Sequence, residues 1–313
     1  MRRAILMVFL LTAMVYGQEQ GTVETVSPAL PPPPPPDAAH VTEANIPLNP
    51  SDLYCAGFVS EHPLPRNRFV AGGVDSPVQF RFQDRQFVYL RGDGYTPGTR
   101  VSFVREMQDV NDYTPFPEIR KMGQRAGRAY GEIGYAAVVE IRGAGLAVAQ
   151  VEFTCDGSVA TGDLAIPFVA KGPLSYRKIS TLDQFPEQHG KVSGRIIGTR
   201  DLDLYPRPGQ KIYLNVGERN GVRAGDYFRI VRAYGRKVMD PVDAEMFNST
   251  AGEDTQKDPP KMLPKNLVEL PRHVLGEAIV ISTQPGSATA MITFALSEIQ
   301  LGDWAELEEV QAR

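Results

Sequence analysis

An internal duplication constrains the fold of this 313-residue chain more than any other feature of its sequence. Five short blocks occur twice, and both series keep the same order. The first series lies at 86–90, 97–105, 133–139, 147–153 and 162–165, and the second at 210–214, 224–232, 275–280, 288–294 and 302–305. Within the third block, Ala137 matches Ala278. Blocks that recur in one order indicate copies of one structural unit. The sequence therefore predicts two modules, at residues 51–169 and 190–309.

The repeated blocks have the alternation of half-buried strands. Apolar residues occupy every second position from Ala147 to Cys155, and the same pattern runs from Ala288 to Phe294. Side chains alternate between the two faces of a strand, so one face of each block is apolar. Small residues at one end and phenylalanine toward the other predict a tapered interior, as in a small barrel. We expect a mainly β fold of two tandem barrel-like modules, with at most one short helix, at 117–129 in the first copy.

Glycine–aspartate pairs stand directly before predicted strands in both copies. The pairs are Gly162-Asp163, Gly225-Asp226 and Gly302-Asp303. Glycine adopts a positive φ without steric cost, and an aspartate side chain accepts hydrogen bonds from nearby backbone N–H groups. We predict that each pair forms a structural turn between two strands. Metal binding by the aspartates is the alternative, but the pairs recur at equivalent places without other ligands nearby.

The N-terminal segment is typical of an exported protein. Arg2 and Arg3 precede an apolar run at 4–16, which predicts a signal peptide at 1–17. The run is shorter than the roughly 20 residues that a membrane-spanning helix needs. An uncleaved anchor is therefore the weaker alternative, and we expect no transmembrane segment after cleavage.

A proline-rich segment at 18–50 follows, with six consecutive prolines from Pro31 to Pro36. It has few large apolar residues and is predicted to be a disordered tether. Binding to a proline-recognising partner is the alternative. A second polar segment, at 170–189, is predicted to link the two modules.

The chain has two cysteines, Cys55 and Cys155. Exported proteins meet an oxidising environment, and an even number of cysteines permits pairing. We predict a Cys55–Cys155 disulfide that ties the start of the first module to its later strand. Two buried free thiols are the alternative.

Residue patterns that would indicate catalysis or a cofactor are missing from the sequence. The four histidines stand far apart, and there is neither a Gly-x-Ser-x-Gly motif nor a phosphate-binding loop. The net charge of −4 argues against nucleic-acid binding. We expect no enzyme, no catalytic residue, no metal and no cofactor. The favoured function is an exported binding or assembly component with an envelope protein as its partner. A carbohydrate- or peptidoglycan-binding module and an exported hydrolase that uses carboxylates are the alternatives.

Short motifs in the second copy carry a family resemblance. They are Ile212-Tyr213-Leu214-Asn215-x-Gly217, Gly221-Val222-x-x-Gly225-Asp226-x-Phe228, Leu275-Gly276-Glu277-Ala278-x-Val280, Ser287-Ala288-Thr289-Ala290 and Ile299-x-x-Gly302-Asp303. This pattern resembles the C-terminal domain of the flagellar assembly protein T family. It is also similar to the β module that follows LysM domains in some exported bacterial proteins, and the first copy fits both more loosely. The resemblance implies a non-catalytic module of the bacterial envelope. The chain lacks a LysM pattern and has two modules, so LysM-type peptidoglycan binding and a flagellar-ring role do not carry over.

Overall fold

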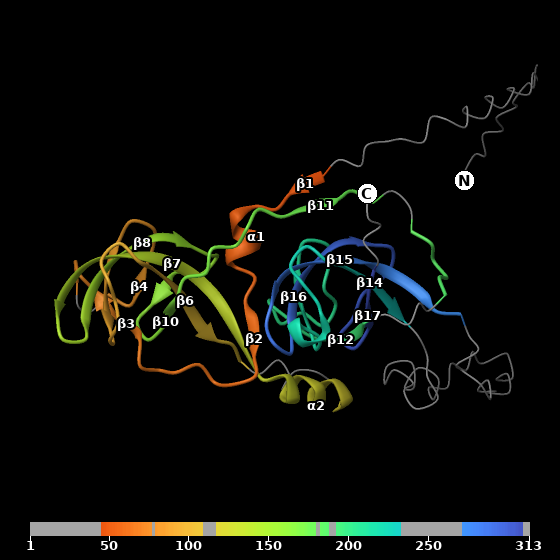
Figure 1. Ribbon diagram of the computed structural model, residues 1–313, viewed down its shortest axis with the longest axis horizontal. Coiled ribbons are helices and arrows are strands. Elements are labelled where there is room, and N and C mark those ends of the chain that lie inside the picture. The colour runs from red at the N-terminus through yellow and green to blue at the C-terminus, as the bar shows by residue number, and fades with distance from the viewer. Residues whose placement is uncertain are drawn as a thin grey trace, which may run out of the picture. The chain divides into compact units, whose positions relative to one another are not determined.

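The computed structural model describes residues 45–76, 79–108, 117–179, 182–187, 192–232 and 271–308. These residues form two closed antiparallel β-barrels of six strands each (Figure 1). The predicted mainly β fold of two tandem barrel-like modules is therefore confirmed. The predicted signal peptide and most of the predicted tether lie outside the described residues. No helix in the described parts of the chain is long and apolar enough to cross a bilayer.

Each barrel takes its six strands from one copy of the repeat. Barrel 1 contains β3 (Phe69–Gly73), β5 (Phe87–Arg91), β6 (Arg100–Glu106), β7 (Arg128–Gly143), β8 (Leu146–Thr154) and β10 (Leu164–Pro167). Barrel 2 contains β12 (Ser193–Thr199), β13 (Lys211–Leu214), β14 (Tyr227–Arg232), β15 (His273–Thr283), β16 (Ala288–Ala295) and β17 (Trp304–Leu307).

Short elements outside the barrels complete the described fold. β1 (Asn45–Pro47) pairs with β11 (Ser175–Arg177), β2 (Phe58–Ser60) pairs with β7, and β4 (Arg81–Phe82) pairs with β9 (Val159–Ala160). The helices are α1 (Pro50–Tyr54), α2 (Pro117–Ala126) and the 3₁₀ helix η2 (Glu218–Asn220). The predicted linker at 170–189 thus contains a strand, β11, which pairs with the start of the described chain.

The strands follow the same order around both barrels. Barrel 1 runs β3-β5-β8-β7-β6-β10 and closes onto β3, whereas barrel 2 runs β12-β13-β16-β15-β14-β17 and closes onto β12. The strands of the two barrels match in chain order, from β3 with β12 to β10 with β17. This match reproduces every pairing between neighbouring strands. The duplication seen in the sequence is therefore a duplication of topology.

One block of the repeat is shifted by a residue relative to the match made from the sequence. Ala136 lies opposite Val151, and Ala278 lies opposite Ile292. Both alanines are fully buried in their barrel cores. The structural equivalent of Ala278 is thus Ala136 rather than Ala137. Residues are equivalent when they occupy the same position in the barrel core, and Ala136 occupies the position of Ala278.

A β-bulge ends the predicted alternation in the strand that follows. Val151 pairs with Ala136 but Phe153 pairs with Tyr135, so one residue of β8 has no partner. Phe153 is half-buried and stacks on Tyr135 at 5.4 Å between ring centroids, instead of filling the core. The backbones approach so closely here that a Cβ on Gly134 would lie 2.2 Å from the Phe153 carbonyl oxygen. Gly276 makes the same approach in barrel 2, to the carbonyl oxygen of Phe294.

Two helices come from the first copy, one more than predicted. α2 corresponds to the predicted helix at 117–129 and ends three residues earlier. α1 has local start signals that a search for long periodic segments misses: Pro50 occupies its first turn, and the Asn49 N–H donates to the Asp52 carboxylate at 3.2 Å. α2 leaves barrel 1 between β6 and β7 and places Ile119 in the core of barrel 2. Barrel 2 is therefore packed against parts of module 1.

Candidate functional site

The aspartates of the predicted turns bind their own backbone and nearby arginines. Asp163 is buried and accepts bidentate hydrogen bonds from Arg105 at 2.7 and 2.8 Å, and a third from the Ala160 N–H at 2.7 Å. Gly162 before it has a φ of +95°, which favours glycine. These bonds occupy the Asp163 carboxylate, so it does not present a free metal ligand.

The same device appears in barrel 2. Asp303 accepts two hydrogen bonds from Arg232 at 2.9 Å and one from the Gln300 N–H at 2.8 Å. Asp226 accepts the N–H of Arg223 at 2.8 Å. The glycines before them, Gly302 and Gly225, have φ values of +94° and +92°. Within the described residues, no group of three or more His, Cys, Asp or Glu side chains is placed to hold a metal ion.

The predicted disulfide is present. Cys55 and Cys155 are joined, with their Cα atoms 5.7 Å apart and a sequence separation of 100. Cys55 follows α1 directly, and Cys155 follows β8. The bond therefore fixes the segment at 48–60 to barrel 1. This segment is also the part of module 1 that covers barrel 2.

Barrel 2 has an outer face that module 1 covers with apolar side chains. This covered face consists of the outward side chains of β13, β15 and β16, with Ser287 just before β16: Lys211, Tyr213, Ile279, Ile281, Ser287, Thr289 and Met291. Leu53 and Ala56 of module 1 pack against Ile279, Ile281 and Met291 in one buried cluster. The burial of these apolar groups stabilises the contact between the modules.

Polar residues of the covered face hold the backbone that lies on it. The Thr289 hydroxyl donates to the Gly57 carbonyl at 2.9 Å, and the Ser287 hydroxyl donates to the Val59 carbonyl at 2.8 Å. Lys211 forms an ion pair with Asp52 at 2.7 Å. Buried carbonyl groups need such partners because leaving them without hydrogen bonds costs free energy. The face is thus matched in detail to residues 48–60.

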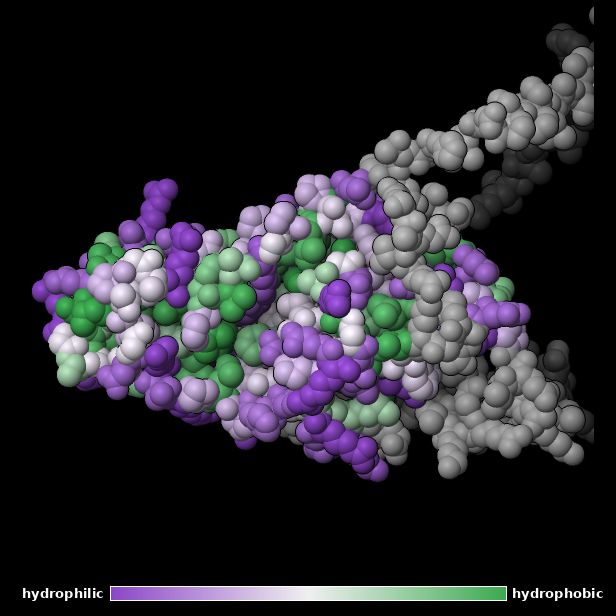
Figure 2. Space-filling view, viewed as in Figure 1, coloured by the Kyte–Doolittle hydropathy of each residue, from purple (hydrophilic) through white to green (hydrophobic). Residues whose placement is uncertain are grey.

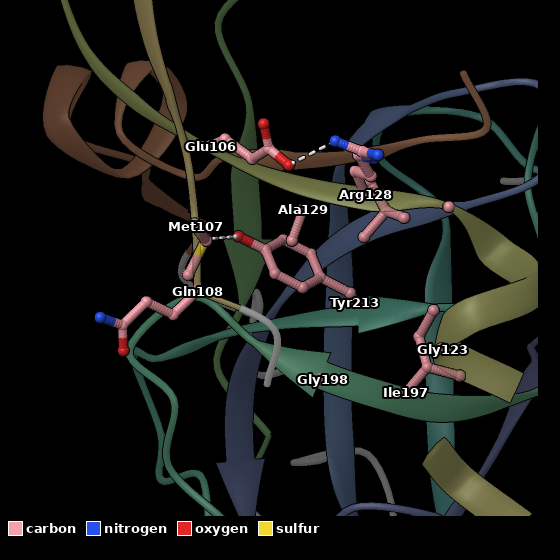
Figure 3. Close-up of a pocket in the computed structure, with 11 residues that line it drawn as sticks. Glu106, Met107, Gln108, Gly123, Arg128, Ala129, Ile197, Gly198 and Tyr213 are labelled. Carbon is pink, nitrogen blue, oxygen red and sulfur yellow. Dashed lines mark hydrogen bonds and ion pairs between the residues drawn. The ribbon is translucent and has the colours of Figure 1, made fainter. Parts of the chain in front are cut away.

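A cavity of about 360 Å³ remains where the covered face meets module 1 (Figure 3). Tyr213 and Ile197 of barrel 2 form one wall, and Met107 and Ala129 of module 1 form another. The Tyr213 hydroxyl donates to the Ala56 carbonyl at 3.4 Å and contacts the Met107 sulfur at 3.5 Å. Burial raises the pKa of Tyr213 above its ordinary value, so this hydroxyl stays protonated.

The carboxylate that lines this cavity is engaged with arginines. Glu106 pairs with Arg128 at 2.8 Å, drawn in Figure 3, and with Arg66 at 2.8 Å. Most glycosidases use two carboxylates across a cleft, about 5–9.5 Å apart. The described lining of the cavity has Glu106 as its one carboxylate.

Barrel 1 carries an open groove of about 780 Å³ on its outer surface. We call this the barrel 1 groove. It is lined by Ala71, Gly72, Gly73, Val74, Phe87, Tyr89, Arg91, Val139, Glu140, Arg142, Leu146 and Val148. Val139 is 50% exposed and is the first of the five exposed residues that end β7. Figure 2 shows hydrophobic side chains in green on the surface that barrel 1 forms, at the left of the view.

The groove is the positional equivalent of the covered face. Tyr89 corresponds to Tyr213, and Val139 corresponds to Ile281, by the strand match given above. Both barrels also have the same β-bulge beside this tyrosine, which leaves Ala71 unpaired in barrel 1 and Ile197 unpaired in barrel 2. One site thus occurs twice, covered on barrel 2 and open on barrel 1.

Three substitutions make the open copy more apolar. Phe87 replaces Lys211, Leu146 replaces Ser287 and Val148 replaces Thr289. The polar groups that hold residues 48–60 on barrel 2 are therefore missing from barrel 1. Arginines stand at the rim instead: Arg91 takes the place of Asn215, and Arg142 pairs with Glu140 at 3.0 Å. The groove can receive an apolar segment with acidic groups beside it.

Sequence reasoning missed the groove, although a signal for it exists. Residues 87–90 and 146–149 are apolar at nearly every position, whereas a strand with one solvated face alternates. Trp304 is half-buried on the outside of barrel 2, with the Arg195 guanidinium 4.0 Å from its ring centre. Among the residues that line the described cavities, tyrosines do not gather into one groove.

No protein-family model matches the chain, and no curated protein sequence is significantly similar to it.

Proposed function

We propose that this chain is an exported, non-enzymatic protein of the bacterial cell envelope that binds a protein partner through the barrel 1 groove. The open groove carries the proposal. Soluble monomers rarely leave large connected apolar patches exposed, and such patches mark interaction sites. The covered face of barrel 2 supports the same interpretation, because there the equivalent site binds polypeptide.

Export is supported by two features. The N-terminal sequence has the pattern of a signal peptide, and disulfides such as Cys55–Cys155 persist in oxidising compartments. Within the described residues, the aspartates that are candidate metal ligands are held in turns, which fits a binding role.

Cell fractionation with site-specific crosslinking tests the proposal. A photo-reactive residue is placed at Val139 in the groove or, as a matched control, at Tyr205, which is 42% exposed on barrel 2. We expect the chain in the envelope or periplasmic fraction, with a crosslinked adduct from position 139 and little from position 205. A cytosolic chain, or equal adducts from both positions, would contradict the proposal.

A further inference from the structure

The contact between the two modules has two halves. The receiving half is the covered face of barrel 2 with Tyr213. The inserted half is residues 54–59 of module 1, which pair with the start of β7 on one side and lie against barrel 2 on the other. Because the chain is duplicated, each half has a counterpart in the other module. The counterpart of the receiving half is the barrel 1 groove.

The counterpart of the inserted half is residues 182–187, which we call the docking segment. Val274 donates its N–H to the Gln184 carbonyl at 2.9 Å, so the segment runs beside the start of β15. Val274 corresponds to Glu132, since each lies two residues before the matched glycine of its strand. The pairing of β2 with β7 covers Phe58 to Ser60 and places Phe58 opposite Tyr130. Counted two residues back from Phe58, Ala56 is level with Glu132, and we match Gln184 with Ala56 on this count.

This register places Phe185 at the position of Gly57. A Cβ on Gly57 would lie 2.6 Å from the Tyr213 hydroxyl, so the covered face has no room for a larger residue there. Phe185 is 59% exposed on the docking segment, and its ring stacks on His273 with 5.9 Å between the ring centroids. The inserted half of module 2 is thus larger than that of module 1 at its central residue.

The barrel 1 groove has smaller residues than the covered face along β3. Ala71 stands in place of Ile197 and Gly73 in place of Thr199, by the strand match of β3 with β12. The open groove measures about 780 Å³. A groove of that size accommodates an aromatic side chain, and aromatic anchors in apolar pockets dominate binding at protein interfaces.

The charges of the two open halves are opposite in sign. Asp183 and Glu187 flank Phe185 on the docking segment. Arg91, Glu140 and Arg142 line the groove, and because Glu140 pairs with Arg142 the three carry one net positive charge. Opposite charges at the rim of an interface speed association and favour one orientation. The inserted half of module 1 has Cys55 and Val59 at the positions of the two acids, so this complementarity is specific to the open pair.

From this match we infer that the barrel 1 groove binds the docking segment of a second copy of this chain, with Phe185 in the groove. The inference rests on the proposed binding role of the groove and names its partner. Each copy uses one surface to receive and another to insert, so the interface is head-to-tail. Such an interface joins further copies into a ring if the rotation closes and into a filament if it does not.

Mass measurement of variants by analytical ultracentrifugation tests the inference with the purified full chain. V139E puts an acid in the groove opposite the acidic docking segment, and F185S removes the anchor. Both side chains are well exposed, so both variants are expected to fold, which thermal unfolding checks. Y205S is the matched control. We expect the wild type and Y205S to associate with rising concentration, and each of the other variants to lose at least about 30-fold in association.

An equimolar mixture of V139E and F185S gives the decisive result. The first retains an intact docking segment and the second an intact groove, so together they form a 1:1 complex that cannot grow. Association by the N-terminal apolar run would be equal in all variants and would not produce this limit. Self-association that F185S leaves unchanged would overturn the inference, as would a wild type that stays monomeric. If such a monomer still gives the groove crosslink in cells, the proposed function stands and its partner is another protein.

Discussion

The two barrels share a topology and differ in what happens to one outer face. On barrel 2 the face is buried under residues 48–60, and its hydroxyl groups hold the carbonyls of Gly57 and Val59. On barrel 1 the same face is open, more apolar and edged with arginines. The comparison teaches that the same outer face can be covered by the chain itself or left open, while the strand order of the barrel beneath it stays the same.

The duplication explains why these changes are tolerated. The inward residues build the cores, and Ala147, Ala149 and Val151 of barrel 1 are buried like Ala288, Ala290 and Ile292 of barrel 2. Outward residues are free to change, because the barrel closes through backbone pairing and inward packing. The face can therefore acquire a binding role without loss of the fold.

The largest expected effect comes from removing the disulfide that holds residues 48–60, the segment that covers barrel 2. Replacing Cys55 and Cys155 by alanine opens a loop of about 100 residues, which the chain-entropy model values at up to about 4.7 kcal/mol. We expect the free energy of unfolding to fall by about 2–5 kcal/mol in denaturant titrations. The reduced wild type is the control and should match the variant. A variant as stable as the oxidised wild type would show that the bond does not hold the cover.

A pair of equivalent residues separates the two faces directly. Ile281 is 2% exposed under the cover, whereas Val139 is 50% exposed in the groove. Ile281→Ala leaves a cavity in a packed cluster and should cost about 2–4 kcal/mol in unfolding free energy. Val139→Ala should change it by less than about 0.5 kcal/mol. Equal losses would mean that the groove is as well packed as the covered face.

The equivalent tyrosines give a smaller contrast. Tyr213→Phe removes a buried hydroxyl that donates to the Ala56 carbonyl, which should cost about 1 kcal/mol. Tyr89→Phe in the open groove should be within about 0.5 kcal/mol of the wild type. Both values come from the same denaturant titration. The account fails here if Tyr89→Phe is the more destabilising change.

The smallest expected effect on stability comes from the protonation of Glu277 in barrel 2. Glu277 is fully buried, and burial raises its pKa to about 7, although Arg177 and Thr293 act in the opposite direction and Glu308 adds to the rise. The folded chain keeps this proton to higher pH than the unfolded chain, so stability should fall as pH rises from about 4.5 to about 7. Barrel 1 has Tyr135 rather than a carboxylic acid at the position equivalent to Glu277. Glu277→Gln should remove on the order of 1 kcal/mol of this pH dependence, measured by thermal unfolding across the range.

Much of the fold was accessible from the sequence, because local signals and long-range structure agree. The repeated blocks predicted the two barrels. The signal-peptide pattern and the even number of cysteines predicted the Cys55–Cys155 bond. Bulges were not accessible: the unpaired residue beside Phe153 moves that side chain from the core to the outside of β8. The sequence alone also does not say which outer face is covered. That depends on where residues 48–60 lie, which tertiary packing decides.

Covalent surface labelling tests the central comparison most directly. Carbene or hydroxyl-radical footprinting, read by mass spectrometry, reports which side chains solvent reaches. In the dilute full chain we predict modification of Tyr89 and Phe185 and protection of Tyr213. At concentrations where copies associate, Tyr89 and Phe185 should become protected together while Tyr213 does not change. Equal modification of Tyr89 and Tyr213 in the dilute chain, or no protection of Tyr89 on association, would contradict the account.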